Sequence, residues 1–349
     1  VINVDGVKEL LRFKLAFWKK LGRLVIDAST SFKHHTSQRS KALGKLSKHF
    51  EYRRCMSGTP SSNGICDLWH QYFILDGGKA LGPSFFGFRN AVCTPTQNGP
   101  AAAHIKWTDK PGIEIMVAEL VKHMTIRHKF EDCVDIPENH KYALPVQLSA
   151  RHLASYNELK DTSMAIFKDS QVTAINAAVL ATKLLQAASG AVYTDDGAYT
   201  SIATERYELV LDLVEERQHS IVFYHWEHQL EELVKLAKSR KLGFSVWNPD
   251  HPEIADEFQE GKYQVLFAHP QSAGHGLTLT RGTSTIWASP TYNLEHYLQG
   301  LKRIHRIGQS EKTETIVIVA EGTVDEKVWA ALQAKSVNMT ALLTELEAA

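Results

Sequence analysis

Cysteine is scarce in this chain, and the few that are present form no recognisable pair. The 349 residues include four cysteines, which are far apart in the sequence: Cys55, Cys66, Cys93 and Cys133. No C-x-x-C pair occurs, so the sequence predicts neither a disulfide framework nor a zinc knuckle. Scattered cysteines are typical of proteins in a reducing compartment, and we expect an intracellular, cytoplasmic protein.

An excess of charge of either sign is also missing. Lysine and arginine together number 39, and so do aspartate and glutamate. A neutral total does not exclude a nucleic-acid partner, because such binding needs only a local basic strip. Apolar runs of membrane-spanning length and a signal-peptide pattern are absent, so we expect no membrane partner. None of the 17 histidines shows H-x-x-x-H or Cys/His ligand spacing.

The second half of the chain alternates between two kinds of pattern. Short runs rich in β-branched and aromatic residues occur at 220–224, 244–247, 263–269, 284–288 and 315–320. Helical patterns between them cover 227–241, 252–259 and 293–307. This alternation predicts βαβ units and a mainly parallel sheet covered on both faces. We therefore expect the fold class α/β, with one complete domain over about residues 201–322.

The remaining segments are less regular. Residues 1–130 predict a first, partial domain, and residues 131–200 predict a helical connector with helices at 150–167 and 172–188. The last segment, 323–349, predicts a helix with Val328, Trp329 and Leu332 on one side. We expect this helix to pack back onto the second domain.

The segment Gln299–Gln309 carries the strongest chemical signal. On a helix over 293–307, the side chains of Gln299, Arg303 and Arg306 project from one face, while apolar residues at the same spacing dock the opposite face. Guanidinium groups are planar, permanently charged donors that suit phosphate oxygens. The segment therefore predicts a rigid phosphate-facing pair of arginines. Two arginines alone are more typical of an ordinary cationic amphipathic helix, so the phosphate role depends on the whole segment.

Three other loops carry residues suited to a nucleotide. Asp27 follows the apolar run Leu24–Ile26, where a strand end would direct its carboxylate toward a magnesium ion. The tetrapeptide Ser57–Pro60 predicts a tight turn with two hydroxyl groups. Gly274 and Gly276 follow the run 263–269, and glycines there allow backbone N–H groups to approach a phosphate closely.

The string Q-x-x-x-R-x-H-R-I-G-Q resembles the last motif of superfamily-two helicases of the Snf branch, which are ATP-driven DNA translocases. Asp27, Ser57–Pro60 and Ser272–Leu279 resemble three earlier motifs of that family in the same order, with Thr278 in place of the usual asparagine. The resemblance covers nearly all of the chain and implies two RecA-like lobes of P-loop NTPase type. It also implies ATP and Mg²⁺ as cofactors and double-stranded or branched DNA as partner; protein partners stay open.

The resemblance assigns a role to individual residues. Arg303 and Arg306 would act as arginine fingers, and Asp27 would hold the magnesium ion. ATP contacts are implied for Gly274, Gly276, Gln299 and Gln309, and coupling between lobes for Ser57, Gly58 and Thr59. DNA contacts are expected from the basic helix 38–49 and from the hydroxyls after the glycines, at Arg39, Lys41, Thr278 and Thr280. For the lysines, a solvated surface is an equal alternative.

Two departures from the family pattern concern catalysis. Ala28 stands where the family has the glutamate that activates water. The phosphate loop G-x-x-x-x-G-K-[S/T] does not occur, and Gly77–Ala80 is only a distant approximation of it. We therefore expect the resemblance to begin partway through the first lobe and the first-lobe sheet to be incomplete.

From Ala28 and the missing loop we expect the chain to hydrolyse ATP feebly or not at all. Three explanations of Ala28 stay open: a replacement that traps a bound state, a natural pseudo-ATPase that serves as a DNA-binding or partner-binding scaffold, or a misleading resemblance in which Asp27 merely caps a strand. The intact surrounding motifs favour the first. The short connection between the lobes favours a bacterial or phage origin.

Overall fold

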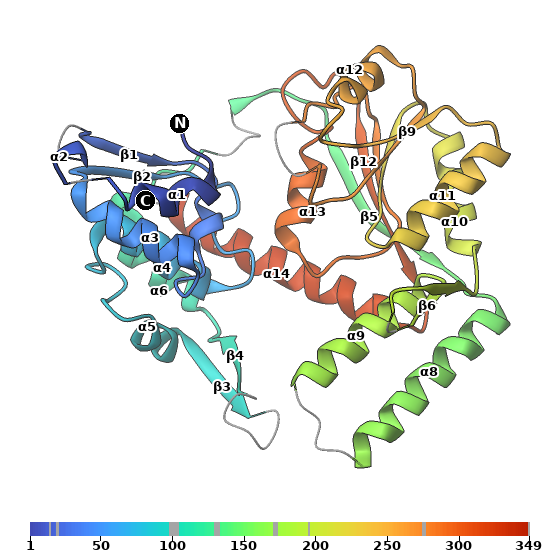
Figure 1. Ribbon diagram of the computed structural model, residues 1–349, viewed down its shortest axis with the longest axis horizontal. Helices are drawn as coiled ribbons and strands as arrows, with labels where there is room; N and C mark the ends of the chain where they lie inside the picture. Colours follow the sequence, from blue (N-terminus) through green and yellow to red (C-terminus); the bar gives the residue numbers. More distant parts are fainter. Residues whose placement is uncertain are drawn as a thin grey trace. The chain divides into compact units, whose positions relative to one another are not determined.

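The computed structural model describes residues 1–13, 15–18, 21–97, 105–128, 133–169, 174–194, 196–273 and 277–347. The chain divides into two compact units (Figure 1). Unit 1 comprises Val1–His128 with Ala334–Ala349, and unit 2 comprises Lys129–Gln333. Among the described residues, no helix has the length and apolar character needed to cross a membrane.

Unit 2 is built on a six-stranded parallel sheet with the order β5-β12-β11-β8-β10-β9. Its strands are β5 (Asn139–Val146), β8 (Ser220–Phe223), β9 (Phe244–Val246), β10 (Val265–Ala268), β11 (Ser284–Trp287) and β12 (Thr313–Ala320). Five of these lie within or across the five runs predicted from the sequence, and the predicted α/β class is confirmed. The central strands β8, β10 and β11 are buried along their whole length, as expected for a parallel sheet covered on both faces.

Helices connect these strands. They are α10 (Glu205–Glu215), α11 (Glu227–Ser239), α12 (Glu253–Glu260) and α13 (Leu294–Leu301). Apolar side chains of α10 and α11 join those of the sheet in one core, which includes Tyr207, Leu233 and Phe267. The parallel sheet and its covering helices thus explain the strand–helix alternation of the sequence.

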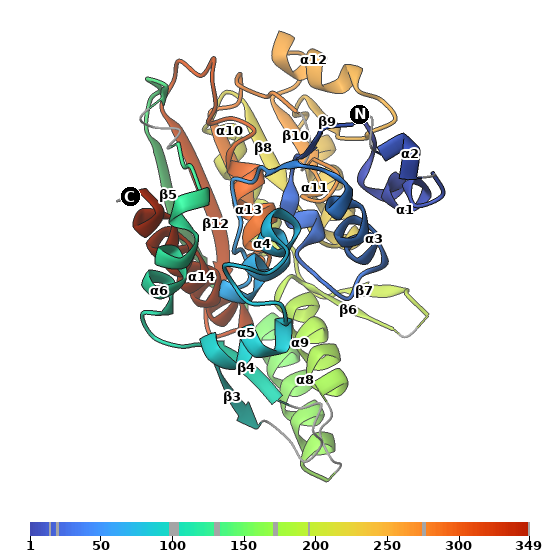
Figure 2. The ribbon, with the colours of Figure 1, turned by 90° about the vertical axis from the view of Figure 1, so that its left-hand side faces the viewer.

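The region 131–200, expected to be a helical connector, also contributes to the sheet. Strand β5 pairs in parallel with β12 from Asn139 opposite Thr313 to Val146 opposite Ala320. Pro145 lies within β5 and obscures the strand in the sequence, but β5 is an edge strand, where proline is tolerated. The expected helices follow as α8 (Ala150–Asp169) and α9 (Ala174–Ala188), which lie side by side (Figures 1 and 2). A hairpin of β6 (Ala191–Tyr193) and β7 (Tyr199–Ser201) leads into α10.

Unit 1 contains a two-stranded parallel sheet of β1 (Arg23–Ile26) and β2 (Tyr52–Cys55). Its other elements are α1 (Val7–Leu10), α2 (Leu15–Trp18), α3 (Gln38–Leu46), α4 (Leu68–Asp76), α5 (Phe85–Val92), α6 (Ile113–Val121) and the hairpin of β3 (Cys93–Gln97) and β4 (Ile105–Asp109). Short 3-10 turns lie at Val4–Gly6, Ser29–Phe32, Ser47–His49, Ile65–Asp67 and Lys122–Met124. With so small a sheet, the middle of β1 remains open to solvent, and Val25 is exposed.

Two cysteines that are distant in the sequence meet in unit 1. The Sγ atoms of Cys66 and Cys93 lie 3.4 Å apart, and both residues are free thiols. Burial raises the pKa of each thiol, so both are protonated near neutral pH.

The last helix, α14 (Val324–Glu347), contributes to both units. Near its start, Val324 packs against the small cluster of Tyr156, Ala187 and Ala188 in unit 2. Farther along, Leu342 and Leu346 join the apolar core of unit 1. The expectation that the whole helix packs onto the second domain was therefore wrong for its carboxyl-terminal half, whose apolar residues complete the other core.

Candidate nucleotide-binding and nucleic-acid-binding residues

Asp27 and Ser57 follow adjacent parallel strands and lie at the same edge of the small sheet. Ile26 is paired with Cys55, and the Met56 N–H donates to the carbonyl of Ile26 at 2.8 Å. Asp27 is exposed, and its Oδ1 accepts the N–H of Ala28 at 2.9 Å. The carboxyl edge of the sheet thus presents the exposed Asp27 carboxylate beside the Ser57 loop.

The backbone turns sharply directly after Asp27. Ala28 has φ 49° and ψ 52°, a left-handed conformation in a residue with a Cβ atom, which costs roughly 1 kcal/mol. The turn is held because the N–H of Ser29 donates to the carbonyl of Met56 at 3.0 Å. Strained backbone of this kind is common at functional sites.

Gln71 joins the two loops and was not predicted from the sequence. It is buried on α4, and its Oε1 accepts the Ser29 hydroxyl at 2.6 Å. Its Nε2 donates to the carbonyl of Pro60 at 2.8 Å and to that of Asp67 at 2.9 Å. One amide therefore fixes the segment after Asp27 to the end of the Ser57–Pro60 loop. The only sequence signal was a glutamine inside an otherwise apolar helix.

Within the Ser57–Pro60 loop, the Ser57 hydroxyl accepts the N–H of Thr59 at 3.0 Å, and both Ser57 and Gly58 are exposed. This local turn is typical of Ser and Thr before a proline-containing bend. Gly77–Ala80 has a different arrangement: the Asp76 carboxylate accepts the N–H groups of Gly78 and Ala80, both at 2.7 Å. Those N–H groups are satisfied by a side chain of the protein and do not form a phosphate cradle.

Asp27 fits a magnesium ion held partly by a nucleotide. Among the described residues, no group of three or more His, Cys, Asp or Glu side chains could hold a metal by itself. Magnesium usually takes one or two carboxylates and completes its shell with phosphate oxygens and water. A single exposed carboxylate at a strand end matches that requirement.

The arginine segment of unit 2 differs from the prediction. Helix α13 begins after Asn293, whose Oδ1 accepts the N–H of His296 at 3.1 Å, but it ends at Leu301. Arg303 and Arg306 lie in the turns that follow, so the expected helix over 293–307 was wrong in its last part. The Arg303 Nε donates to the carbonyl of Gln299 at 3.0 Å and so caps the helix end.

The two arginines nevertheless converge. The Nη1 atoms of Arg303 and Arg306 donate to the same acceptor, the carbonyl of Leu277, at 3.1 and 2.8 Å. Arg303 is only 9% exposed, and burial, followed by the charge of Arg306, lowers its pKa. The buried Arg303 and the half-buried Arg306 carry like charges that repel each other, and an anion beside them would relieve that repulsion. Turns, and not one helical face, therefore bring the two arginines together.

The residues predicted to contact ATP near the arginines differ in how buried they are. Gln309 is buried, and its Nε2 donates to the carbonyls of Thr280, Gly282 and Ile304, so it fastens two loops together. Gln299 is partly buried near Glu295 on α13. Gly274 and Gly276 lie outside the described residues.

The predicted DNA contacts lie on separate elements. Thr278 is exposed, whereas the Thr280 hydroxyl accepts the Nε2 of Gln259 at 3.1 Å. In unit 1, Lys41 is exposed on α3, and Arg39 lies 3.8 Å from the Asp5 carboxylate. The loop with Thr278 and helix α3 both present hydrogen-bond donors to solvent. Of these two segments, α3 alone carries a row of basic residues.

Unit 2 is a parallel α/β unit, a class of fold that binds nucleotides at the carboxyl ends of its strands. The sequence matches identify the family. Residues 9–189 match the SNF2-related domain, and residues 205–308 match the helicase conserved C-terminal domain. The chain belongs to the SNF2 family, and the predicted resemblance is confirmed.

Several known proteins are similar over almost the whole chain. A protein of Acyrthosiphon pisum secondary endosymbiont phage 1, putative protein p41, is 30% identical over 94% of this chain and 73% of its own length. An uncharacterized ATP-dependent helicase of Mycoplasma genitalium is 23% identical over 89% of this chain, but only 29% of its own length. A DNA annealing helicase and endonuclease of Mus musculus is 25% identical over 90% of this chain and 29% of its own length.

Two solved structures are also similar. The C-terminal part of the Fun30 ATPase domain covers 61% of this chain and 99% of its own, with 13% identity and a TM-score of 0.47. The Sulfolobus solfataricus SWI2/SNF2 ATPase core in complex with dsDNA covers 96% of this chain and 73% of its own, with 18% identity and a TM-score of 0.45. The family assignment rests on the sequence matches.

Proposed function

We propose that this SNF2-family chain is the core of a motor that couples ATP hydrolysis to movement on double-stranded or branched DNA. The observation that carries the proposal is the convergence of Arg303 and Arg306 on the carbonyl of Leu277. Fixed guanidinium groups stabilise the charge that develops on a transferred phosphoryl group. The family match and the relatives named as ATP-dependent helicases support this chemistry.

The proposed cofactors are ATP and Mg²⁺. In this proposal the exposed carboxylate of Asp27 holds the ion, which would neutralise charge on the phosphate oxygens. Gln71 keeps the Asp27 and Ser57 loops in register through its bonds to Ser29 and Pro60. The Ser57, Gly58 and Thr59 turn is the proposed route by which nucleotide state reaches the rest of the motor. The phage relative supports a bacterial or phage origin. The proposed place of action is intracellular, where DNA and ATP are available.

Ala28 limits the rate of hydrolysis in this proposal. A methyl group can neither accept a proton nor orient water, and a general base is worth about 10²–10⁴ in rate. The experiment is ATP turnover by the complete protein with Ala28 and with Ala28→Glu, each with and without duplex DNA. We expect Ala28→Glu to raise DNA-stimulated turnover by about 10²-fold or more.

A scaffold that binds DNA or a partner without hydrolysis is the second candidate, and Ala28 itself favours it. If both proteins bind DNA but neither turns over ATP, the chain is a scaffold and the proposed motor function is wrong. Arg303→Ala in the Ala28→Glu background provides the matched control. It should abolish the regained turnover if the arginine acts on the phosphate.

A further inference from the structure

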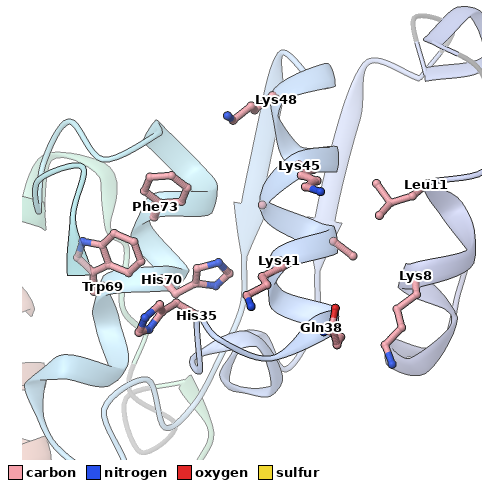
Figure 3. A pocket seen from close by; sticks show the side chains of 12 residues that line it. Lys8, Leu11, His35, Gln38, Lys41, Lys45, Lys48, Trp69, His70 and Phe73 are labelled. Atoms are coloured by element: carbon pink, nitrogen blue, oxygen red, sulfur yellow. The ribbon is translucent and has the colours of Figure 1, made fainter. Parts of the chain in front are cut away.

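A pocket of about 470 Å³ lies in unit 1, between α1, α3 and α4. Figure 3 shows lysines projecting from α3 along one side and aromatic side chains from α4 along another. The volume is within the range of about 300–1,000 Å³ that is usual for small-molecule sites. None of the motif residues that match the family's nucleotide chemistry lines this pocket.

The charge of the lining is of one sign. Lys8, Lys41, Lys45 and Lys48 line the pocket, and no aspartate or glutamate does. Across the part of the chain that the structure describes, none of these four lysines forms a salt bridge. Four uncompensated ammonium groups around one hollow repel each other, and an anion within it would remove that repulsion.

The opposite wall is aromatic and held in place. The rings of Trp69 and Phe73 are stacked with centroids 5.0 Å apart. Trp69 Nε1 donates to the carbonyl of Gly82 at 3.0 Å, and His70 Nδ1 is bonded to the carbonyl of Phe32 at 2.6 Å. Burial lowers the pKa of His70, so this ring is neutral and belongs to the flat wall. A phosphate alone would not need such a surface.

We propose that this pocket binds one nucleotide unit of an unpaired DNA strand, with the phosphate against the lysines and the base against Phe73 and its neighbours. Aromatic platforms beside cationic grooves are the usual means of holding single strands without sequence preference. The inference rests on the proposed DNA-dependent function and deepens it. The preferred substrate is then DNA with a single-stranded branch or end, in preference to a blunt duplex.

The experiment is equilibrium binding of the full chain to a labelled blunt duplex and to the same duplex with a short unpaired extension. We expect the extension to tighten binding about tenfold, since stacking of one base supplies a gain of this order. Lys41→Gln with Lys45→Gln should remove most of the gain and reduce the salt dependence for the extended substrate. Phe73→Leu should remove the gain while blunt-duplex affinity stays unchanged.

The matched control is Lys79→Gln with Lys106→Gln, which removes two exposed lysines of the same unit that do not line the pocket. It should keep the preference for the extended substrate, and thermal melting should verify that every variant folds. Equal binding of the two substrates would overturn the pocket inference and leave the proposed function standing. Absence of binding to either would overturn both. Displacement of the extended substrate by free dAMP as readily as by a single strand would show a site for free nucleotides and overturn the assignment to DNA.

Discussion

At the scale of single residues, buried polar groups with several partners are the ones that sequence patterns failed to assign. Asp27 and Ser57 could be predicted, because each follows a strand at the place where parallel sheets bind nucleotides. Gln71 could not, since one glutamine in an apolar helix has no spacing partner that indicates its role. Gln309 was predicted to contact ATP from its motif position, but its three carbonyl acceptors were invisible in the sequence.

A buried ion pair leads to the first prediction of stability. Arg206 and Asp325 are 2% and 0% exposed and lie 2.5 Å apart, and Arg206 also donates to the carbonyls of Ala188, Ala288 and Ile318. Asp325→Ala leaves an unpaired buried cation, so the free energy of unfolding of unit 2 should fall by about 3–5 kcal/mol. Urea denaturation followed by tryptophan fluorescence measures the loss.

The double variant Arg206→Met with Asp325→Leu is the control for that prediction. It removes both charges and fills similar volume, so it should recover much of the lost stability. A single variant as stable as the parent, or a double variant less stable than the single one, would contradict the role of charge burial.

At the scale of helices and strands, the spacing of apolar residues in the sequence predicted the elements that bury an apolar face in the core of unit 2. Strands β8, β9, β10, β11 and β12 were predicted because each is a short apolar run, and helices separate all of them except β10 and β11. Strand β5 was missed because Pro145 breaks its pattern, and its pairing with β12 joins residues far apart in the chain. The end of α13 was missed because Arg303 and Arg306 fit helical spacing, while the carbonyls that hold them lie in another loop.

Gly300 of α13 supplies a prediction at this scale. A Cβ atom there would lie 2.7 Å from Trp287 Cζ2 and 3.0 Å from Phe223 Cε2, so the helix sits on the sheet at a distance that only glycine permits. Overpacking of this kind usually costs about 1–3 kcal/mol, and Gly300→Ala should lower the free energy of unfolding of unit 2 by that amount. It should also shift the two arginines that follow.

A second helical glycine provides the comparison. At Gly44 of α3, a Cβ atom would meet nothing closer than His70 Nε2, at 3.6 Å. Gly44→Ala should therefore stabilise unit 1 by about 0.5–1 kcal/mol, through the better helix propensity of alanine. Paired chemical denaturation of the two variants checks the contrast, and equal effects of the same sign would argue against a steric origin.

At the scale of the whole molecule, the sequence predicted two α/β lobes but not which segments of the chain belong to each. The last helix follows the second lobe in sequence, yet Leu342 and Leu346 belong to the core of unit 1. Helical periodicity identifies an apolar face and says nothing about which core it completes. The two family matches divide the chain at a different place, since the first covers residues 9–189 and so includes β5, α8 and α9 of unit 2, while the second covers residues 205–308.

The stability of unit 2 should depend on pH through two histidines, the buried His228 and the half-buried His225. Burial, followed by His269, lowers the pKa of His225 to about 4, and burial with a contribution from Arg206 lowers that of His228 to about 4. Both are neutral when folded but take up a proton near pH 6.5 when unfolded. Their stabilising contribution is therefore complete above pH 6.5 and is lost as the pH falls from 6.5 toward 4. As the pH falls through that window, each histidine lowers the free energy of unfolding of unit 2 by about 1.4 kcal/mol per pH unit.

Urea denaturation of unit 2 at pH 7 and pH 5 measures this effect. From each histidine we expect a loss of about 2 kcal/mol between the two pH values, and His225→Asn should remove its share of the difference. His49→Gln, at an exposed position of unit 1, should leave the pH dependence of unit 2 unchanged. A parent protein whose unit 2 is equally stable at both pH values would show that these histidines gain a proton without cost. That result would require water or the hydroxyl groups of Ser189 and Tyr193 to stabilise the imidazolium in the folded state, because desolvation disfavours the charged ring.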